Sequence, residues 1–196
     1  RSAWARDLNR ALNGIQPELP LVPGNRLEPL VTGDEAFPRM LEAIQTARHH
    51  VHLQSFIIGP DRVGRQFLEA LAAKARSGVA VRLLYDRFGS TPAVLRRLFA
   101  PYRKIAGFQI EDWSLANPLK RQVQFNLRNH RKTLVVDGRL AFMGGINLQE
   151  DHVTRPSGLP IRDYHFEVEG PAVLQLQYTF LQDWYCMTDE DPDVLM

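Results

Sequence analysis

The sequence predicts an α/β domain in which helices flank both faces of a mixed, largely parallel β-sheet. Two observations carry this prediction. Apolar segments with strand character alternate with amphipathic helical segments along most of the chain. Residues 79–85 are largely apolar with Arg82 as their only charge, which is typical of a buried parallel strand. We assign residues 27–190 to one domain, residues 1–26 to a lead-in segment and residues 191–196 to an acidic tail.

The spacing of apolar and turn residues predicts the elements in chain order. The first helix is expected to begin at an Asp34 N-cap and to run through Arg48, with Phe37, Met40, Leu41 and Ile44 on its apolar face. A second helix is expected to open at Asp61 or Gly64 and to end near Arg76, with Gly78 as a left-handed cap. The other expected elements are helices near 3–12, 91–100 and 171–187 and strands near 27–31, 50–58, 79–85, 108–112, 131–136, 139–143 and 163–168.

The composition is that of an ordinary globular domain. The 196 residues include 44% hydrophobic residues, 13 Gly and 13 Pro, which excludes a disordered chain and collagen. The single Cys186 cannot form an internal disulfide and is expected to pack in the core. No apolar run reaches the roughly 20 residues that span a bilayer. Because the chain begins with Arg1, we expect an excised or processed piece of a longer protein.

Residues 113–136 contain no acidic side chain and five basic ones: Lys120, Arg121, Arg128, Arg131 and Lys132. Such a local positive field suits a phosphate-bearing ligand, either a nucleic acid or an anionic lipid. Trp113 and Phe125 could line the entrance to a site, and ordinary packing is the alternative for both.

The chemistry concentrates between His130 and Asn147. If residues 130–136 are extended, His130 and Lys132 point to the same side of the sheet, and Asp137-Gly138 closes a hairpin. Gly144 and Gly145 allow the backbone to approach a ligand closely, and Asn147 offers an amide donor. A histidine nucleophile with Lys132 and Asn147 as clamps on phosphate oxygens predicts attack at phosphorus with no metal and no cofactor.

These residues resemble the phospholipase D superfamily, whose signature is His-x-Lys-x4-Asp-x6-Gly-x-x-Asn. The match is complete: His130, Lys132, Asp137, Gly144 and Asn147. Gly145 stands where the superfamily often has Ser, as is common in its cardiolipin synthase branch. The resemblance extends to residues 33–35, 78–90 and 162–173 and covers roughly residues 27–187. The chain looks most like the N-terminal half of a bacterial cardiolipin synthase.

The resemblance implies a mechanism. One histidine attacks the phosphodiester to give a phosphohistidine, a second histidine from a matching motif protonates the leaving alcohol, and an acceptor hydroxyl or water resolves the intermediate. By its place in the Arg-Asp-x-His segment, Asp163 resembles the acid that orients the attacking histidine. Asp137 then looks like a structural residue at the hairpin, although its carboxylate is the alternative partner of the ring.

The chain carries one such motif, which leaves three hypotheses open. The first is phosphatidyl transfer or phosphodiester cleavage on an anionic phospholipid, with the second motif elsewhere in a longer chain and the protein at the bacterial inner membrane. The second is a homodimeric phosphodiesterase or endonuclease that acts on nucleic acid, with His130 of each subunit at one phosphate. The third is an isolated half that binds its ligand without turnover.

The remaining histidines receive structural interpretations. His49, His50 and His52 could suggest a metal site, but only His50 and His52 share a strand face, so a structural or surface role is expected. His152 and His165 are expected to be structural as well.

Overall fold

The structure is a computed structural model that describes residues 22–114, 116–117, 122–123, 128–156 and 158–196. The expected helix near 3–12 and most of the lead-in lie outside the described residues, as do Lys120, Arg121 and Phe125.

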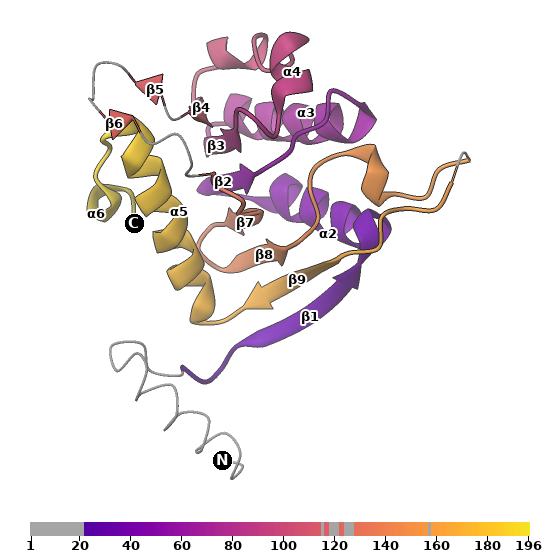
Figure 1. The fold of residues 1–196 in the computed structure, drawn as a ribbon. Coiled ribbons are helices and arrows are strands. Elements are labelled where there is room, and N and C mark those ends of the chain that lie inside the picture. Colours follow the sequence, from indigo (N-terminus) through magenta and orange to yellow (C-terminus); the bar gives the residue numbers. More distant parts are fainter. Residues whose placement is uncertain (1–21, 115, 118–121, 124–127, 157) are drawn as a thin grey trace.

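One mixed sheet forms the centre of the described chain (Figure 1). Its strands lie in the order β1 (Arg26–Val31), β9 (Tyr164–Glu169), β8 (Leu140–Gly144), β7 (Thr133–Val136), β2 (His50–Ser55), β3 (Ala80–Asp86) and β4 (Phe108–Trp113). A separate two-stranded ribbon, β5 (Ala116–Asn117) with β6 (Gln122–Val123), follows β4 and was not predicted. The α/β class and the mixed sheet are confirmed.

The prediction that the sheet is largely parallel is wrong. Only β2 with β3 and β3 with β4 pair in parallel, whereas the other four neighbouring pairs are antiparallel. A parallel pair of neighbouring strands needs a long crossover connection, and α-helical crossovers join neighbouring strands from β2 to β3 and from β3 to β4. The tight turn after β7 makes β8 antiparallel to β7, and β9 and β1 continue this alternation of strand direction.

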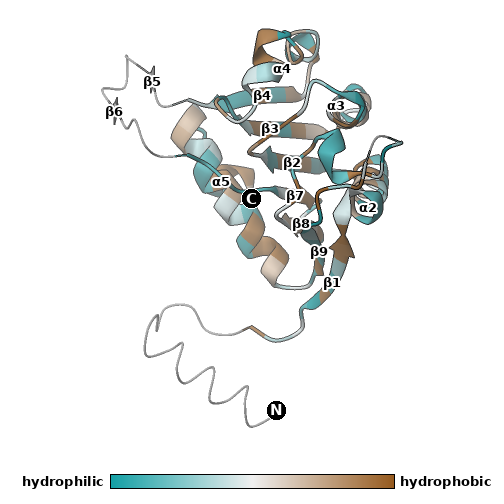
Figure 2. Ribbon diagram, turned by 45° about the vertical axis from the view of Figure 1, so that its right-hand side comes forward, coloured by the Kyte–Doolittle hydropathy of each residue, from teal (hydrophilic) through white to brown (hydrophobic). Residues whose placement is uncertain are grey.

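Helices cover both faces of the sheet, as predicted (Figure 2). The helices α2 (Thr32–Thr46) and α3 (Arg62–Arg76) pack on one face, in the same core cluster as Leu134. The helix α5 (Ala172–Thr188) packs on the other face, where its Val173 contacts the cluster that contains Val135. The alternation of Leu134 and Val135 between the two faces follows from the two-residue period of a strand. The short elements are α4 (Thr91–Leu95), α6 (Pro192–Leu195) and the 3-10 helices η1 (Tyr102–Lys104) and η2 (Glu150–His152).

Some helix limits differ from the predicted ones. The helix α2 begins at Thr32, so Asp34 lies in its first turn, where its carboxylate accepts the backbone N–H and the hydroxyl of Thr154 instead of capping the helix. It ends at Thr46 and not at Arg48. The helix expected near 91–100 is shortened to α4.

Other local predictions are confirmed. Asp61 is the N-cap of α3 and accepts the N–H of Gly64 at 3.0 Å. Gly78 has the positive φ of a left-handed cap, +91°. Phe37, Met40, Leu41 and Ile44 of α2 are buried.

The hairpin between β7 and β8 turns at Asp137 and Gly138, whose φ values are 53° and 63°. Arg139 donates its N–H to the Val136 carbonyl at 3.0 Å, so the turn has the primed geometry that Asp-Gly favours. The ladder pairs Val136 with Leu140 and therefore leaves three residues in the loop. The strand β7 begins at Thr133, so His130 and Lys132 precede the strand and do not lie on it.

The helix α5 buries Phe180, Leu181 and Trp184, against which Trp113 packs, as in the packing alternative for Trp113. Cys186 is exposed on this helix, so the prediction that it packs in the core is wrong. Within the residues that the structure describes, no helix combines the length and the apolarity needed to cross a membrane.

Candidate active site

The side chains of His130 and Lys132 lie together, as the sequence predicts. The Lys132 ammonium nitrogen is 3.1 Å from Nδ1 of His130 and donates to the His130 carbonyl at 2.7 Å. His130 is exposed, whereas Lys132 is buried at 5% exposure. Burial lowers the pKa of Lys132, and the negative charge of Asp163 opposes this shift. Because an ammonium can only donate, Nδ1 of His130 is the acceptor in this contact.

The ring of Phe56 packs against His130 and Lys132, and Phe56 was not predicted as a site residue. Its ring centroid is 4.2 Å from that of His130, and the Lys132 nitrogen lies 5.3 Å from the same centroid. A cation near an aromatic face is attracted by the ring quadrupole. Phe56 comes directly after the end of β2, and its chain position far from His130 is why spacing alone could not reveal the contact.

Asn147 presents its amide nitrogen as a donor. Its Oδ1 accepts the backbone N–H of Ile57 at 3.1 Å, next to Phe56 in the chain. Since Oδ1 is fixed by the backbone, the orientation of the carboxamide is defined and Nδ2 remains as a donor group for a ligand. The structure therefore brings Asn147 to the segment that also supports His130.

Gly144 and Gly145 leave no room for a side chain. A Cβ at Gly144 would lie less than 3.0 Å from the Tyr164 carbonyl, and a Cβ at Gly145 would lie less than 3.0 Å from the Asp163 carboxylate. Gly144 thus allows β8 and β9 to approach each other closely, and Gly145 makes the space in which the Asp163 carboxylate sits. A serine at position 145 would need that carboxylate to move.

Asp163 lies near Lys132 and not against the ring of His130. Its carboxylate accepts the N–H of Tyr164 at 2.7 Å, and its charge acts to raise the pKa of Lys132, His152 and His165. Among the described residues, His130 makes no hydrogen bond to Asp163. The structure therefore brings Asp163 to the cationic side of the site, and its predicted role as orienting acid stays a prediction.

Asp137 lies at the opposite end of β7 from Lys132. Its carboxylate accepts three backbone N–H groups, those of Arg48 at 2.8 Å, His49 at 2.8 Å and His50 at 2.9 Å. Burial acts to raise the pKa of Asp137, but these hydrogen bonds together hold it below its usual value. The contacts join the hairpin to the start of β2 and leave this carboxylate out of reach of the His130 ring.

The other histidines are mostly buried. His165 is 1% exposed with neither ring nitrogen hydrogen-bonded, and burial lowers its pKa to about 4. Burial also lowers the pKa of His152. The His50 and His52 rings stack at 4.6 Å, and His52 stacks on Phe180 at 4.8 Å. In the described part of the chain, no three His, Cys, Asp or Glu side chains gather as a group that could hold a metal ion.

Two arginines in the described part of the basic stretch have different surroundings. Arg128 lies over the ring of Phe88, 4.4 Å from its centroid. Arg131 makes an ion pair with Asp183 of α5, a residue that the sequence analysis did not select. Asp183 is the only charged side chain in α5, and a lone charge in an otherwise uncharged helix is the signal that could have revealed it.

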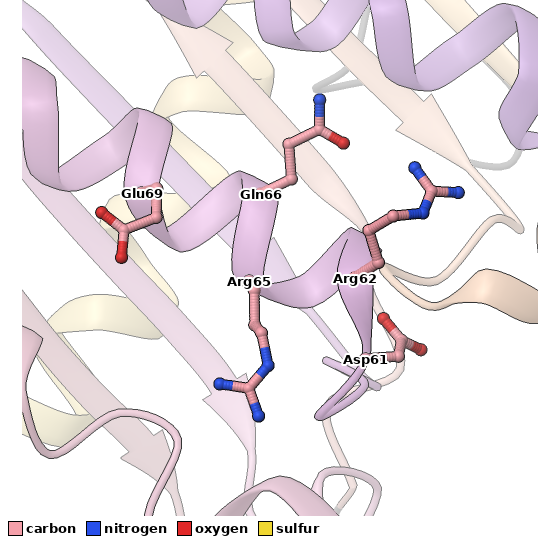
Figure 3. A pocket seen from close by; sticks show the side chains of 5 residues that line it. All are labelled: Asp61, Arg62, Arg65, Gln66 and Glu69. Atoms are coloured by element: carbon pink, nitrogen blue, oxygen red, sulfur yellow. The ribbon is translucent and has the colours of Figure 1, made fainter.

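Two hollows differ in their relation to this site. A cavity of about 210 Å³ between α5 and the sheet includes Lys132 and Gly144 in its lining. Figure 3 shows a second hollow, on α3, lined by Asp61, Arg62, Arg65, Gln66 and Glu69. None of the predicted site residues lines the hollow on α3.

The fold and the His130, Lys132 and Asn147 arrangement define a phospholipase D-like domain. The structure of Nuc from Salmonella typhimurium, described as a phospholipase D family member, matches with a TM-score of 0.63 at 16% identity and covers 84% of this chain and 97% of that chain. NucT from Helicobacter pylori matches with a TM-score of 0.62 at 12% identity and covers 84% of this chain and 98% of that chain.

The sequence identifies the family within this class. The family described as "Cardiolipin synthase, PLD-like domain" matches residues 40–184, and the chain belongs to it. Cardiolipin synthase 1 of Bacillus anthracis is 41% identical over 156 residues, which are 79% of this chain and 30% of the relative. Cardiolipin synthase A of Pseudomonas fluorescens is 37% identical over 179 residues, which are 91% of this chain and 37% of the relative. The chain thus spans about a third of the length of these relatives, and the predicted family is confirmed.

Proposed function

We propose that this chain supplies half of an active site that cleaves a phospholipid phosphodiester and transfers the phosphatidyl group to an alcohol. The observation that carries the proposal is the 3.1 Å contact between the Lys132 ammonium and His130, in a domain of the cardiolipin synthase family. It joins a nucleophile to a cation that can hold a phosphate oxygen.

In the proposed first step, Nε2 of His130 attacks phosphorus and the bond from phosphorus to the leaving alcohol breaks. A histidine of the second half gives its proton to that alcohol, and the phosphatidyl group remains on His130. The acceptor hydroxyl then attacks phosphorus, its proton passes to the second histidine, and the bond to His130 breaks. His130 is thereby regenerated, and no metal or cofactor takes part.

The contact between Lys132 and Nδ1 of His130 has to change when substrate binds. Nδ1 of His130 accepts from Lys132, so a neutral ring carries its proton on Nε2 and cannot attack through that nitrogen. A phosphate oxygen that draws the Lys132 ammonium away from Nδ1 would release the ring to carry its proton there. We propose that Lys132 and Asn147 bind the phosphate oxygens, with the backbone at Gly144 and Gly145 close by. We also propose that Asp163 keeps Lys132 charged and accepts a hydrogen bond from Nδ1–H of His130.

The second histidine has to come from another half. We propose that it belongs to a matching motif in a longer chain or to a second copy of this chain. The proposed substrate is an anionic phospholipid, and the proposed location is the surface of a bacterial inner membrane.

A second candidate is a homodimeric phosphodiesterase that acts on nucleic acid. Two observations favour it: the chain matches nearly the whole of two compact structural neighbours, and the exposed Arg128 adds positive charge near His130. An isolated half that binds lipid without turnover is the third candidate.

The test incubates the chain with phosphatidylglycerol vesicles and a primary alcohol, with mass spectrometry of the lipid products and of acid-quenched protein for phosphohistidine. If a second copy supplies the other half, the first candidate predicts exchanged lipid from the wild-type chain alone. If a longer chain supplies it, exchange is expected once that second half is added. In both cases no exchange is expected from His130→Ala. His49→Ala, at an exposed position outside the site, is the matched control and should keep full activity. Exchange by His130→Ala would overturn the assignment.

The same preparation separates the other two candidates. Cleavage of DNA without lipid exchange, with a rate that falls steeply as salt rises, would support the phosphodiesterase because phosphate contacts release counterions. Vesicle binding without exchange or DNA cleavage would support the isolated half.

A further inference from the structure

We propose that Asp183 is the positioning residue of the site: from α5 it holds both neighbours of His130 and thereby fixes where the imidazole stands. The inference rests on the proposed function of His130 as nucleophile.

The Asp183 carboxylate receives three donor side chains from two segments, β2 and the residues around His130. Gln54 of β2 donates its Nε2 at 2.9 Å and Asn129 donates its Nδ2 at 2.8 Å. Arg131 donates Nη1 to both carboxylate oxygens, at 2.8 Å and 2.5 Å. We call Asp183, Gln54, Asn129 and Arg131 the Asp183 anchor. Three donor side chains around one buried acidic group leave little freedom for the carboxylate or for the segment that it holds.

Two of the donors flank His130 directly. The backbone N–H of Arg131 also donates to Oδ1 of Asn129 at 3.2 Å, so residues 129 and 131 are joined to each other across the histidine. Both flanking side chains turn toward α5. The His130 side chain does not join them and instead contacts Phe56 and Lys132. The direction of the imidazole is thus a consequence of what its neighbours bind.

The ring itself has few restraints. His130 is exposed, and its contacts among the described residues are those with Phe56 and Lys132. Lys132 has to leave Nδ1 when it binds a phosphate oxygen. The Asp183 anchor then keeps Nε2 of His130 in line with phosphorus. A misplacement of 1 Å can lower the reaction rate about 10²-fold.

The anchor is separate from the packing that holds α5 on the sheet. That packing comes from Phe180, Leu181 and Trp184, all buried. Asp183→Asn keeps the size of the side chain but removes the charge that pairs with Arg131. We expect the helix to stay in place while residues 129–131 gain mobility.

The first experiment measures backbone ¹⁵N order parameters on the whole 196-residue chain. In the wild type we expect a rigid value at His130, about 0.85, and in Asp183→Asn a value below about 0.6. Glu190→Gln is the matched control. It removes an acidic group that receives the Trp184 indole N–H and the Gln109 amide, yet it touches none of residues 129–131. A rigid His130 in Asp183→Asn would overturn the proposal.

The second experiment measures lipid exchange, corrected for the folded fraction. Asp183→Asn should lower kcat about 10²-fold with little change in KM, whereas Glu190→Gln should change neither. Arg131→Gln, at a half-exposed side chain, should lower kcat by a smaller factor and should add nothing in the Asp183→Asn background. Independent, multiplying effects would contradict a shared anchor.

The two proposals fail in different ways. Exchange by His130→Ala would remove the proposed nucleophile, while the order parameters would still decide whether Asp183 holds the segment. Normal kcat in Asp183→Asn together with an inactive His130→Ala would overturn the anchor alone.

Discussion

The Lys132 ammonium touches His130 twice, at 3.1 Å to ring Nδ1 and at 2.7 Å to the backbone carbonyl of the same residue. The Lys132 side chain is buried, and its nitrogen lies over the Phe56 ring, 5.3 Å from the ring centroid. One compact ammonium therefore reaches a ring nitrogen, a carbonyl and an aromatic face within a small space. That geometry suits a group which later moves to a phosphate oxygen.

Lys132→Arg tests whether the site needs a point charge. A planar guanidinium is wider than an ammonium, keeps its charge and cannot occupy the same buried position without displacing Phe56 or His130. We expect kcat/KM for lipid exchange to fall at least about 10²-fold. Lys74→Arg, at a half-buried position of α3 outside the site, is the control and should leave the rate unchanged. An active Lys132→Arg enzyme would contradict the clamp.

Gly144→Ala tests the close approach of β8 and β9. The added Cβ would lie less than 3.0 Å from the Tyr164 carbonyl, and a backbone atom cannot move aside cheaply. Overpacking of this kind costs about 1–3 kcal/mol of the free energy of unfolding, which denaturant titration can measure. Gly158→Ala is the matched control because its Cβ would meet nothing within 4 Å. Equal stability of the two variants would refute the steric argument.

The parts of the fold that depend on neighbours in the chain could be predicted. The Asp137-Gly138 turn and the alternation of Leu134 and Val135 follow from local backbone preferences, and the structure has both. The proportion of parallel strand pairs could not be predicted, because it depends on which strands are neighbours in the sheet. The segment before Thr133 has strand character in sequence but lacks a place in the ladder, so His130 and Lys132 precede β7.

The same distinction applies to the site. The spacing of His130 and Lys132 predicts that their side chains meet, and they do. Phe56 follows the end of β2 and contacts His130, and Asp183 of α5 contacts the neighbours of His130. No spacing within one segment reports such contacts. A charge without a partner in its own helix, as at Asp183, is the kind of local inconsistency that marks a tertiary contact.

Asp137→Asn tests the structural role of the hairpin carboxylate. Asn tolerates positive φ, so the variant keeps the turn and loses mainly charge-assisted hydrogen bonds to residues 48–50. We expect a loss of about 1–3 kcal/mol in the free energy of unfolding at neutral pH, with kcat per folded molecule unchanged. A lower kcat in fully folded Asp137→Asn would show that Asp137 takes part in catalysis.

The pH dependence of that loss has a defined sign. The folded-state pKa of Asp137 is lowered, so its contribution is fully present above the unfolded value of about 3.9 and is lost as the pH falls through the folded pKa. The difference in stability between wild type and Asp137→Asn should be constant from about pH 5 to pH 8 and should shrink below about pH 4.

His165 is expected to make the fold sensitive to acid. Its folded-state pKa is about 4 and its unfolded value about 6.5, so the unfolded chain binds more protons between these limits. The free energy of unfolding should therefore decrease as the pH falls from about 6.5 to about 4, by about 3 kcal/mol from this residue. His165→Leu, which removes a ring whose nitrogens have no hydrogen bond, should flatten that slope. The residual slope belongs to His50, His52 and His152, whose pKa values burial also lowers. Denaturant titrations of both proteins at several pH values measure the difference, and parallel curves would show that His165 does not titrate in this range.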